Sequence, residues 1–201
     1  HDVAFLMKMS GLLSIHSLIW LFMKSIAAAL SGQGIRVICF DDTAEPHTPD
    51  AIFPNNWVSF HADGTVVLYP MLAVNRRTER RMDIIDSLAD QYGFDVRRVI
   101  DLTQHENDGH YLEGTGSMVL DRSNRIAYAC LSPRTHLDAL GDFAQRMDYE
   151  VVAFEAVDRD GAAIYHTNVL MNVGASLAVI CDEAIRDRVQ REAVLKSLAQ
   201  C

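Results

Sequence analysis

Hydrophobic and polar positions along this chain alternate between two patterns, one typical of short buried strands and one typical of helices with a single apolar face. Apolar residues that recur every three or four positions predict helices, here over residues 14–31, 79–92, 136–147 and 186–199. Short apolar runs bounded by Gly, Pro, Asn or Asp predict strands, here at residues 35–40, 57–60, 65–69, 96–100, 117–120, 126–130, 150–154, 169–173 and 177–181. Strands mixed with helices in this way indicate an α/β protein.

The predicted elements repeat in the order strand, strand, helix, strand. Residues 57–100 and 117–154 each contain one complete ββαβ unit, and residues 169–199 contain a third without its closing strand. The first helix and the strand at 35–40 match the second half of another unit. Repeats of roughly 50 to 60 residues are typical of arrays in which each unit buries a face against the next. We therefore expect an incomplete propeller whose exposed strand edges could allow self-association.

The chain is predicted to have two parts. Residues 1–34 form an atypical N-terminal segment with one helix, and residues 35–201 form a single domain that holds the repeats. Residues 11–30 are largely apolar, but Lys24, His16 and three serines interrupt them, whereas a spanning helix needs about 20 mostly uncharged residues. This segment is expected to pack on a sheet and not to cross a membrane.

The composition and spacing of the residues argue against several kinds of partner and cofactor. The net charge of −9 argues against a nucleic-acid partner, which would favour a basic face. Four widely spaced cysteines indicate a reducing, cytoplasmic setting, and Cys39, Cys130 and Cys181 are predicted to be buried in the core. No spacing typical of a metal site or a dinucleotide-binding loop is present, so neither a metal nor another cofactor is expected. Five histidines are expected to be solvated: His47, His61, His105, His110 and His136.

Each predicted hairpin is entered through a polar segment that contains chemically useful side chains. Glu113 stands directly before Gly114-Thr115-Gly116, where glycines allow a tight turn that holds the carboxylate in place. Taken singly, such residues are ordinary turn or strand-end positions. In a radial array, however, equivalent positions of successive units meet at the axis. We therefore expect one shared site formed by Asp50, Asn55, Asn56, Glu113, His166 and Asn168.

Several segments together resemble the pentein superfamily of guanidine-modifying enzymes, and within it the arginine-deiminase-related branch of citrulline-utilisation hydrolases. The matching stretches are residues 48–57, 68–71, 75–80, 112–116, 131–135 and 164–171. The resemblance covers about residues 35–200 and implies a propeller of five ββαβ units, of which this chain would hold about three to four.

The resemblance also implies a mechanism. In the family a cysteine thiolate attacks the guanidinium or ureido carbon, and a histidine moves the protons. On the matching positions, His166 would be the general acid/base, and Glu113 would orient it and could bind a substrate nitrogen. The family pattern further implies substrate-binding residues: Arg134 for the carboxylate, with Arg76 or Arg77 sharing that role, and Asp50 for the α-amino group.

Two departures from the family pattern affect the function. Guanidine-binding relatives have aspartates where this chain has Asn56 and Asn168, and a neutral amide suits a neutral ureido group. This favours citrulline as the substrate, with ornithine, ammonia and carbon dioxide as products. The family's cysteine lies in a fifth unit that these residues do not include, and Cys201, at a helix end, is not assigned as the nucleophile. We therefore expect a truncated chain that lacks activity by itself.

Two alternatives stay open. One is an arginine deiminase or amidinotransferase type of activity on an arginine-like substrate. The other is a non-catalytic pentein fragment or a binding module on the same fold. A converging His, Glu and Arg disfavours a pure scaffold, which has no need of them.

Overall fold

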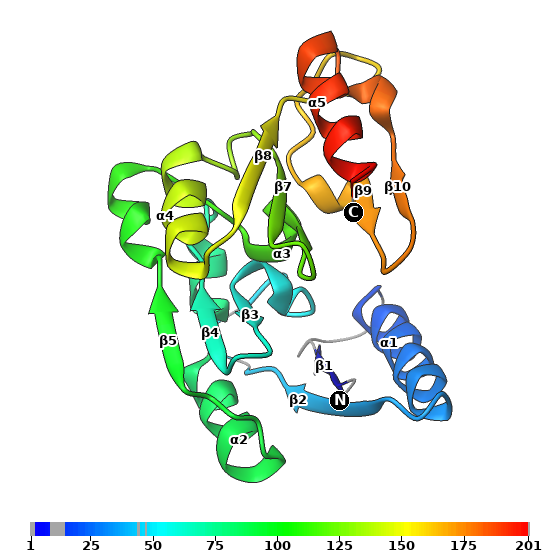
Figure 1. The fold of residues 1–201 in the computed structure, drawn as a ribbon. Helices are drawn as coiled ribbons and strands as arrows, with labels where there is room; N and C mark the ends of the chain where they lie inside the picture. Colours follow the sequence, from blue (N-terminus) through cyan, green and yellow to red (C-terminus); the bar gives the residue numbers. More distant parts are fainter. Residues whose placement is uncertain (1–2, 9–14, 44, 47, 201) are drawn as a thin grey trace. The chain divides into compact units, whose positions relative to one another are not determined.

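The structure is a computed structural model of the 201-residue chain, and it describes residues 3–8, 15–43, 45–46 and 48–200. It is a mixed α/β fold with four small sheets, as the sequence predicts (Figure 1). The chain divides into two compact units. Unit 1 comprises residues 1–54 and 73–95, and unit 2 comprises residues 55–72 and 96–201.

Unit 1 contains a strand–helix–strand element. β1 (Val3–Lys8) pairs in parallel with β2 (Arg36–Asp41), and α1 (Ile15–Gly32) connects them. The predicted helix and second strand are present, but the pattern missed β1 because its apolar residues run directly into the apolar residues that follow. The other helices of unit 1 are the short 3-10 helix η2 (Val74–Glu79) and α2 (Met82–Tyr92).

Unit 2 contains the repeats. In each three-stranded sheet the first two strands are antiparallel and the third returns parallel to the second. The first sheet has β3 (Val58–Phe60), β4 (Thr65–Leu68) and β5 (Arg98–Asp101), and the second has β6 (Met118–Asp121), β7 (Ile126–Cys130) and β8 (Glu150–Phe154). A two-stranded sheet follows with β9 (Met171–Val173) and β10 (Ala178–Ile180). The predicted order strand, strand, helix, strand is therefore confirmed.

Short helices connect the strands, and two longer ones cover the second sheet. The longer helices are α4 (Leu137–Met147) and α5 (Arg188–Leu198). The short ones are η1 (Pro54–Asn56), η3 (Thr103–Asp108), α3 (Gly114–Ser117), η4 (Thr167–Val169) and η5 (Asp182–Ala184).

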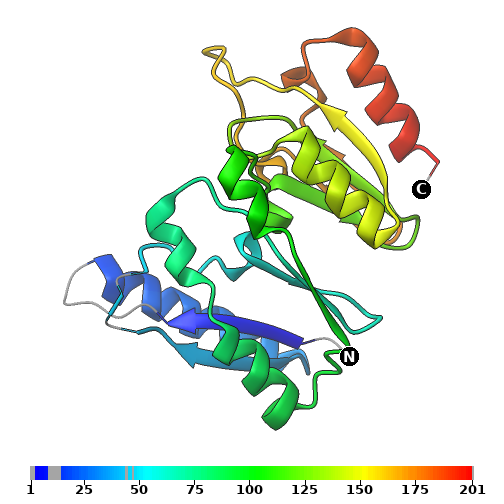
Figure 2. The ribbon, with the colours of Figure 1, turned by 90° about the vertical axis from the view of Figure 1, so that its left-hand side faces the viewer.

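The central strand β7 is buried on both faces because successive side chains of a strand point in opposite directions. Ala127 and Ala129 pack in one apolar cluster with Phe143 of α4. Tyr128 packs in another with Val194 of α5. Figures 1 and 2 show the two helices on opposite sides of this sheet. The core of unit 2 therefore fixes β7, and with it the loops at its ends.

The structure corrects the prediction for two cysteines. Cys130 is buried, but Cys39 and Cys181 are exposed. On β2 the buried position is the neighbouring Ile38, so Cys39 points the other way. Cys181 directly follows β10, whose residues are mostly exposed. Apolar runs alone did not show which face of each strand is covered.

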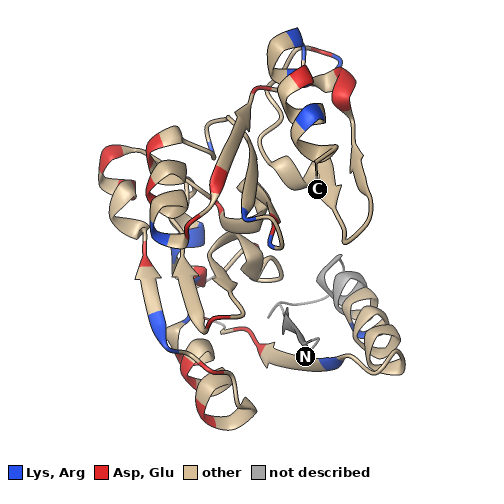
Figure 3. Cartoon of the chain, in the orientation of Figure 1, with Lys and Arg blue, Asp and Glu red and all other residues tan. Residues whose placement is uncertain are grey.

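Charged side chains are distributed along both units. Figure 3 shows acidic positions on α2, α4 and η5, and basic positions on other segments such as β5 and α5. None of the helices within the described ranges is both long enough and apolar enough to cross a membrane.

His61 is partly buried, which corrects its predicted solvated state. Its Nε2 lies 2.9 Å from Ser59 Oγ, whose hydroxyl lies 2.7 Å from the Tyr69 hydroxyl. Its Nδ1 accepts a hydrogen bond of 3.1 Å from Arg122. Burial, together with the charge of Arg122, lowers the pKa of His61 from 6.5 to about 4.

We predict that His61 makes the protein less stable in mild acid. The unfolded chain binds a proton at this histidine below about pH 6.5, whereas the folded chain does so only near pH 4, so stability falls as the pH drops through this window. Between pH 7 and pH 5 the wild type should lose about 1 kcal/mol more free energy of unfolding than His61→Gln, after allowance for partial solvent screening. Urea unfolding at both pH values measures the difference, and an equal loss in the two proteins would contradict the prediction.

Candidate functional site

The site is built around α3, where the backbone comes unusually close to its neighbours. Gly114 has φ +47°, and a Cβ there would lie 2.2 Å from the carbonyl oxygen of Asn55. A Cβ at Gly116 would lie 2.4 Å from Asn56 Nδ2 and 3.0 Å from the His166 ring. The predicted Gly-Thr-Gly turn is thus a single helical turn, and its glycines let the other segments approach the residue before it.

That residue is Glu113, whose side chain is fully buried. Its Oε2 accepts hydrogen bonds from His166 Nε2 at 2.8 Å and from Arg134 Nη1 at 3.0 Å. Its Oε1 accepts one of 3.2 Å from the backbone N–H of Leu72. A buried carboxylate is therefore held by three donors from three separate segments of unit 2.

These partners keep Glu113 ionised. Burial alone would raise its pKa, but the hydrogen bonds and charges of His166 and Arg134 outweigh burial and hold the pKa below its usual 4.5. Because an ionised carboxylate only accepts hydrogen bonds, Nε2 of His166 must carry a proton. Nδ1, which faces Gly116, is then the ring nitrogen that the bond to Glu113 leaves available.

The guanidinium of Arg134 is only partly used by Glu113. Its Nη1 is bonded to Glu113, and its guanidinium lies over the ring of Tyr165, 5.2 Å from the ring centre. About 29% of its side chain is exposed. The remaining nitrogens of the guanidinium fork can therefore meet a carboxylate that approaches from solvent.

Two buried hydroxyls that the sequence did not single out support this arrangement. The Ser117 hydroxyl accepts a bond of 2.8 Å from Glu113 N–H and donates one of 2.7 Å to the carbonyl of Arg134. The Thr167 hydroxyl accepts a hydrogen bond of 2.7 Å from the N–H of Cys130 and donates one to the carbonyl of Ser117. Thr167 stands between the predicted site residues His166 and Asn168, and Ser117 follows the predicted Gly-Thr-Gly turn. Only the fold shows that both hydroxyls are buried and hydrogen-bonded.

The structure brings together four of the predicted side chains: Asn56, Glu113, Arg134 and His166. Asn56 donates a hydrogen bond of 3.4 Å to the carbonyl of Glu113, and Asn55 contributes its backbone carbonyl beside Gly114. Asn168 is exposed and lines an open hollow of about 300 Å³ together with Thr115. Its predicted role remains a prediction.

The remaining predicted residues belong to unit 1. Arg76 is buried and forms a two-pronged ion pair with Glu79, and its Nε lies 3.4 Å from a carboxylate oxygen of Asp50. The backbone N–H of Asp50 also donates to Glu79. These contacts give Arg76 and Asp50 a structural role in their own unit. Arg77, which follows Arg76, is partly exposed.

Cys130 lies beside the site but is a poor nucleophile. Its thiol is buried and points to the carbonyl of Ile164 at 3.4 Å. Burial raises its pKa to about 11, so it stays protonated at neutral pH. Cys201 lies outside the described residues.

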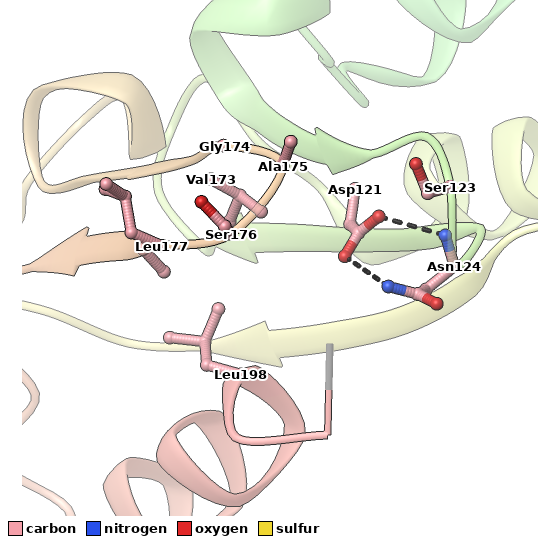
Figure 4. A pocket seen from close by; sticks show the side chains of 10 residues that line it. Asp121, Ser123, Asn124, Val173, Gly174, Ala175, Ser176, Leu177 and Leu198 are labelled. Carbon is pink, nitrogen blue, oxygen red and sulfur yellow. Dashed lines mark hydrogen bonds between the residues drawn. The ribbon is translucent and has the colours of Figure 1, made fainter.

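A second hollow, of about 60 Å³, lies between the turn after β6 and the turn after β9 (Figure 4). Its one carboxylate is Asp121, and both of its oxygens accept hydrogen bonds from Asn124. This carboxylate is used to hold its own turn, so the hollow is not a second candidate site.

We predict that Gly116→Ala destabilises the protein by about 1–3 kcal/mol, because the added methyl group would force Asn56 and His166 apart. Gly141→Ala is the matched control. Gly141 is exposed on α4, and a Cβ there would meet nothing within 4 Å, so this change should stabilise by about 0.5–1 kcal/mol. Urea unfolding compares the two variants. Similar stabilities would mean that the close approach at Gly116 is not a constraint.

Solved structures support the fold assignment. The chain aligns with apo ArgZ, described as an arginine dihydrolase from the ornithine-ammonia cycle in cyanobacteria, with a TM-score of 0.74 and 18% identity over 98% of this chain and 29% of that one. It also aligns with unliganded AgrE, with a TM-score of 0.71 and 19% identity over 92% of this chain and 25% of that one. A dimethylarginine dimethylaminohydrolase adduct gives a TM-score of 0.64 and 13% identity over 87% of this chain and 66% of that one. At these identities the likeness concerns the fold, and this chain spans less than a third of full-length ArgZ or AgrE.

A search of curated proteins finds no match to the sequence. The family model described as "N,N dimethylarginine dimethylhydrolase, eukaryotic" matches residues 17–201. The match covers most of the chain and includes every residue of the Glu113 site. The chain therefore belongs to this family, within the pentein superfamily of arginine-modifying hydrolases.

Proposed function

We propose that this protein is part of a cysteine-dependent hydrolase that converts citrulline to ornithine, ammonia and carbon dioxide. The observation that carries the proposal is the set of contacts around Glu113. Its charge is already balanced by His166 and Arg134, and the polar side chain next to it is the neutral amide of Asn56.

The proposed reaction uses His166 as the proton carrier. A cysteine thiolate forms a bond to the ureido carbon, the bond from that carbon to the terminal nitrogen breaks, and His166 Nδ1 gives its proton to the departing ammonia. Water then attacks the thioester-like intermediate, His166 takes its proton, and the thiolate leaves. The product, a carbamate of ornithine, loses carbon dioxide. Glu113 would hold the imidazole in one orientation and stabilise its protonated form throughout.

Arg134 would bind the α-carboxylate of the substrate. Part of its side chain is exposed, and stacking on Tyr165 fixes the plane of the guanidinium. A planar fork that already holds Glu113 through one nitrogen can still offer the others to a second carboxylate. This requires a free carboxylate on the substrate, as an α-amino acid has.

A neutral substrate suits the charges of this site. A guanidinium withdrawn from water needs an anionic partner, and an unpaired buried charge costs several kcal/mol. Within the described network of Asn56, Glu113, Arg134 and His166, the one carboxylate already has two cationic or hydrogen-bonding partners. The amide of Asn56 can both donate and accept, which suits a ureido group.

The attacking cysteine is not Cys130, for the reasons of burial and pKa given above. We therefore propose that the thiolate is provided by a cysteine outside the described residues. Cys201 is one candidate in this sequence, and the test below includes it.

Arginine is the second candidate substrate. The similar structures favour it. ArgZ is described as an arginine dihydrolase, and a cysteine-to-alanine mutant of AgrE was solved with L-arginine. Such a substrate would need an anionic partner beyond the four side chains described above.

We predict that citrulline is preferred. Ammonia release should be measured with citrulline, arginine and agmatine offered separately. Because this chain is expected to lack activity by itself, the kinetic predictions here refer to an enzyme that also carries the attacking cysteine. We expect kcat/KM for citrulline to exceed that for arginine by at least about tenfold, and agmatine, which lacks the carboxylate, to be the poorest. Preference for arginine would contradict the proposal. The Cys201→Ala variant decides whether Cys201 is the nucleophile, and ornithine binding by calorimetry detects a site that binds without turnover.

Charge variants test the reason for the preference. Asn56→Asp combined with Asn168→Asp should shift the ratio of kcat/KM values towards arginine, because each adds a carboxylate near the proposed substrate position. Gln104→Glu combined with Gln145→Glu adds the same two charges at exposed positions of unit 2 outside the Glu113 network and should leave the ratio unchanged. An unchanged ratio in the double variant would mean that these amides do not select the substrate.

We also predict that Glu113→Gln lowers kcat for ammonia release by at least about 100-fold with a much smaller change in KM. The amide cannot balance a protonated His166 and so fails to stabilise it when it carries the second proton. A change confined to KM would indicate that Glu113 acts only in substrate binding.

A further inference from the structure

The structure brings together three side chains that can ligate a metal, two of which are histidines that the sequence predicted to be solvated. They are His110, His136 and Asp138, and one ligand atom from each lies within 4.8 Å of the other two. We propose that they form a binding site for a divalent transition-metal ion such as Zn²⁺, Co²⁺ or Ni²⁺. This site is separate from the Glu113 side chain and its partners.

Backbone pairing holds the two histidines in place. Leu112 forms an antiparallel bridge with Thr135, and the N–H of His136 donates a hydrogen bond of 2.7 Å to the carbonyl of Tyr111. His110 follows Gly109, whose left-handed conformation ends η3. Asp138 lies in the first turn of α4, two residues after His136, which is the N-cap of that helix. The positions from which the three side chains emerge are therefore fixed before any ion binds.

The ligand atoms are nearly close enough to share an ion. His110 Nδ1 lies 3.3 Å and His136 Nδ1 lies 3.8 Å from Asp138 Oδ2. Ligands bonded tetrahedrally at about 2.0–2.2 Å from a metal are roughly 3.3–3.6 Å apart. The distances are thus compatible with one shared ion once the side chains rotate. The side chains of His136 and Asp138 are 45% and 64% exposed, which leaves them room to do so.

The two imidazole rings are stacked, with centres 3.8 Å apart and an angle of 3° between their planes. The lone pair of an imidazole nitrogen lies in the plane of its ring, so two parallel rings cannot both aim at one ion. One ring must turn on binding. His136 Nδ1 also accepts a capping hydrogen bond of 3.2 Å from Asp138 N–H, so the ion must either replace this bond or use Nε2. Metal binding should therefore change the stacking of the His110 and His136 rings, and this change can be observed directly.

The kind of ligand atom selects the kind of ion. Two imidazole nitrogens and one carboxylate oxygen suit borderline ions such as Zn²⁺, Co²⁺ and Ni²⁺, whereas Mg²⁺ and Ca²⁺ prefer oxygen ligands. Three protein ligands leave a fourth position for water or another group.

An ion bound by His110 and His136 would also affect the proposed active site. The paired segments that carry His110 and His136 also carry Glu113 and Arg134, and Glu113 N–H faces the carbonyl of Arg134 at 3.4 Å. An ion bound by both histidines would link these segments a second time. Metal binding should therefore raise the melting temperature of the protein, by mass action on the folded state.

The test is titration of the tag-free, metal-free chain with Zn²⁺ and with Ni²⁺ by calorimetry, with thiols alkylated because Cys39 and Cys181 are exposed. We expect one ion per chain and an increase in melting temperature. His110→Ala and Asp138→Asn should each weaken binding at least about tenfold, since each removes one ligand. His166→Ala is the control for metal binding at the Glu113 site and should bind as the wild type does.

Absence of binding, or binding that neither ligand variant weakens, would overturn the proposal. If His166→Ala is folded by circular dichroism and binds more weakly, that would overturn the proposal too, because the ion would then lie at the Glu113 site. Imidazole resonances observed by NMR in the unmodified chain give a readout that needs no variant. Zn²⁺ should shift the signals of His110 and His136, and signals that stay unchanged would also exclude the site.

Discussion

A carboxylate that is withdrawn from water must be surrounded by hydrogen-bond donors, and Glu113 obtains them from three segments of unit 2. Leu72 follows the first hairpin, Arg134 lies in the loop after β7, and His166 precedes η4 and β9. Removing one donor would leave a partly unpaired buried charge, which is among the costliest defects in a folded protein. The same contacts that relieve this cost place an imidazole and a guanidinium beside each other. Stability and the proposed chemistry therefore depend on one set of bonds.

Close packing of the backbone makes those bonds possible. Side chains at Gly114 or Gly116 would occupy the space of Asn55, Asn56 and His166. Behind them, the buried hydroxyls of Ser117 and Thr167 satisfy backbone groups that would otherwise be unpaired. The antiparallel pairing of Leu112 with Thr135 then extends this ordered region from Glu113 to the histidines near α4. One short stretch of paired backbone thus connects the candidate active site with the proposed metal site.

The repeats explain why these groups meet. Each ββαβ unit returns its third strand parallel to its second, and β7 is covered by α4 on one face and α5 on the other. Loops that occupy the same position in successive ββαβ repeats are consequently brought to one region. This is how residues more than a hundred positions apart, such as Asn56 and His166, come to lie against the same glycine.

The sequence by itself determined the order of strands and helices, the repeat and the family, because these follow from local hydrophobic periodicity, turn residues and short motifs. It also singled out Glu113, His166, Arg134 and Asn56, which the structure joins in one network. Only the tertiary structure decided that Arg76 is committed to Glu79, that Cys39 and Cys181 are exposed, and that Ser117 and Thr167 are buried supports. It also decided that His110, His136 and Asp138 lie together. The physical reason is that burial and pairing depend on which distant segments pack together, and a pattern of neighbouring residues does not contain that information.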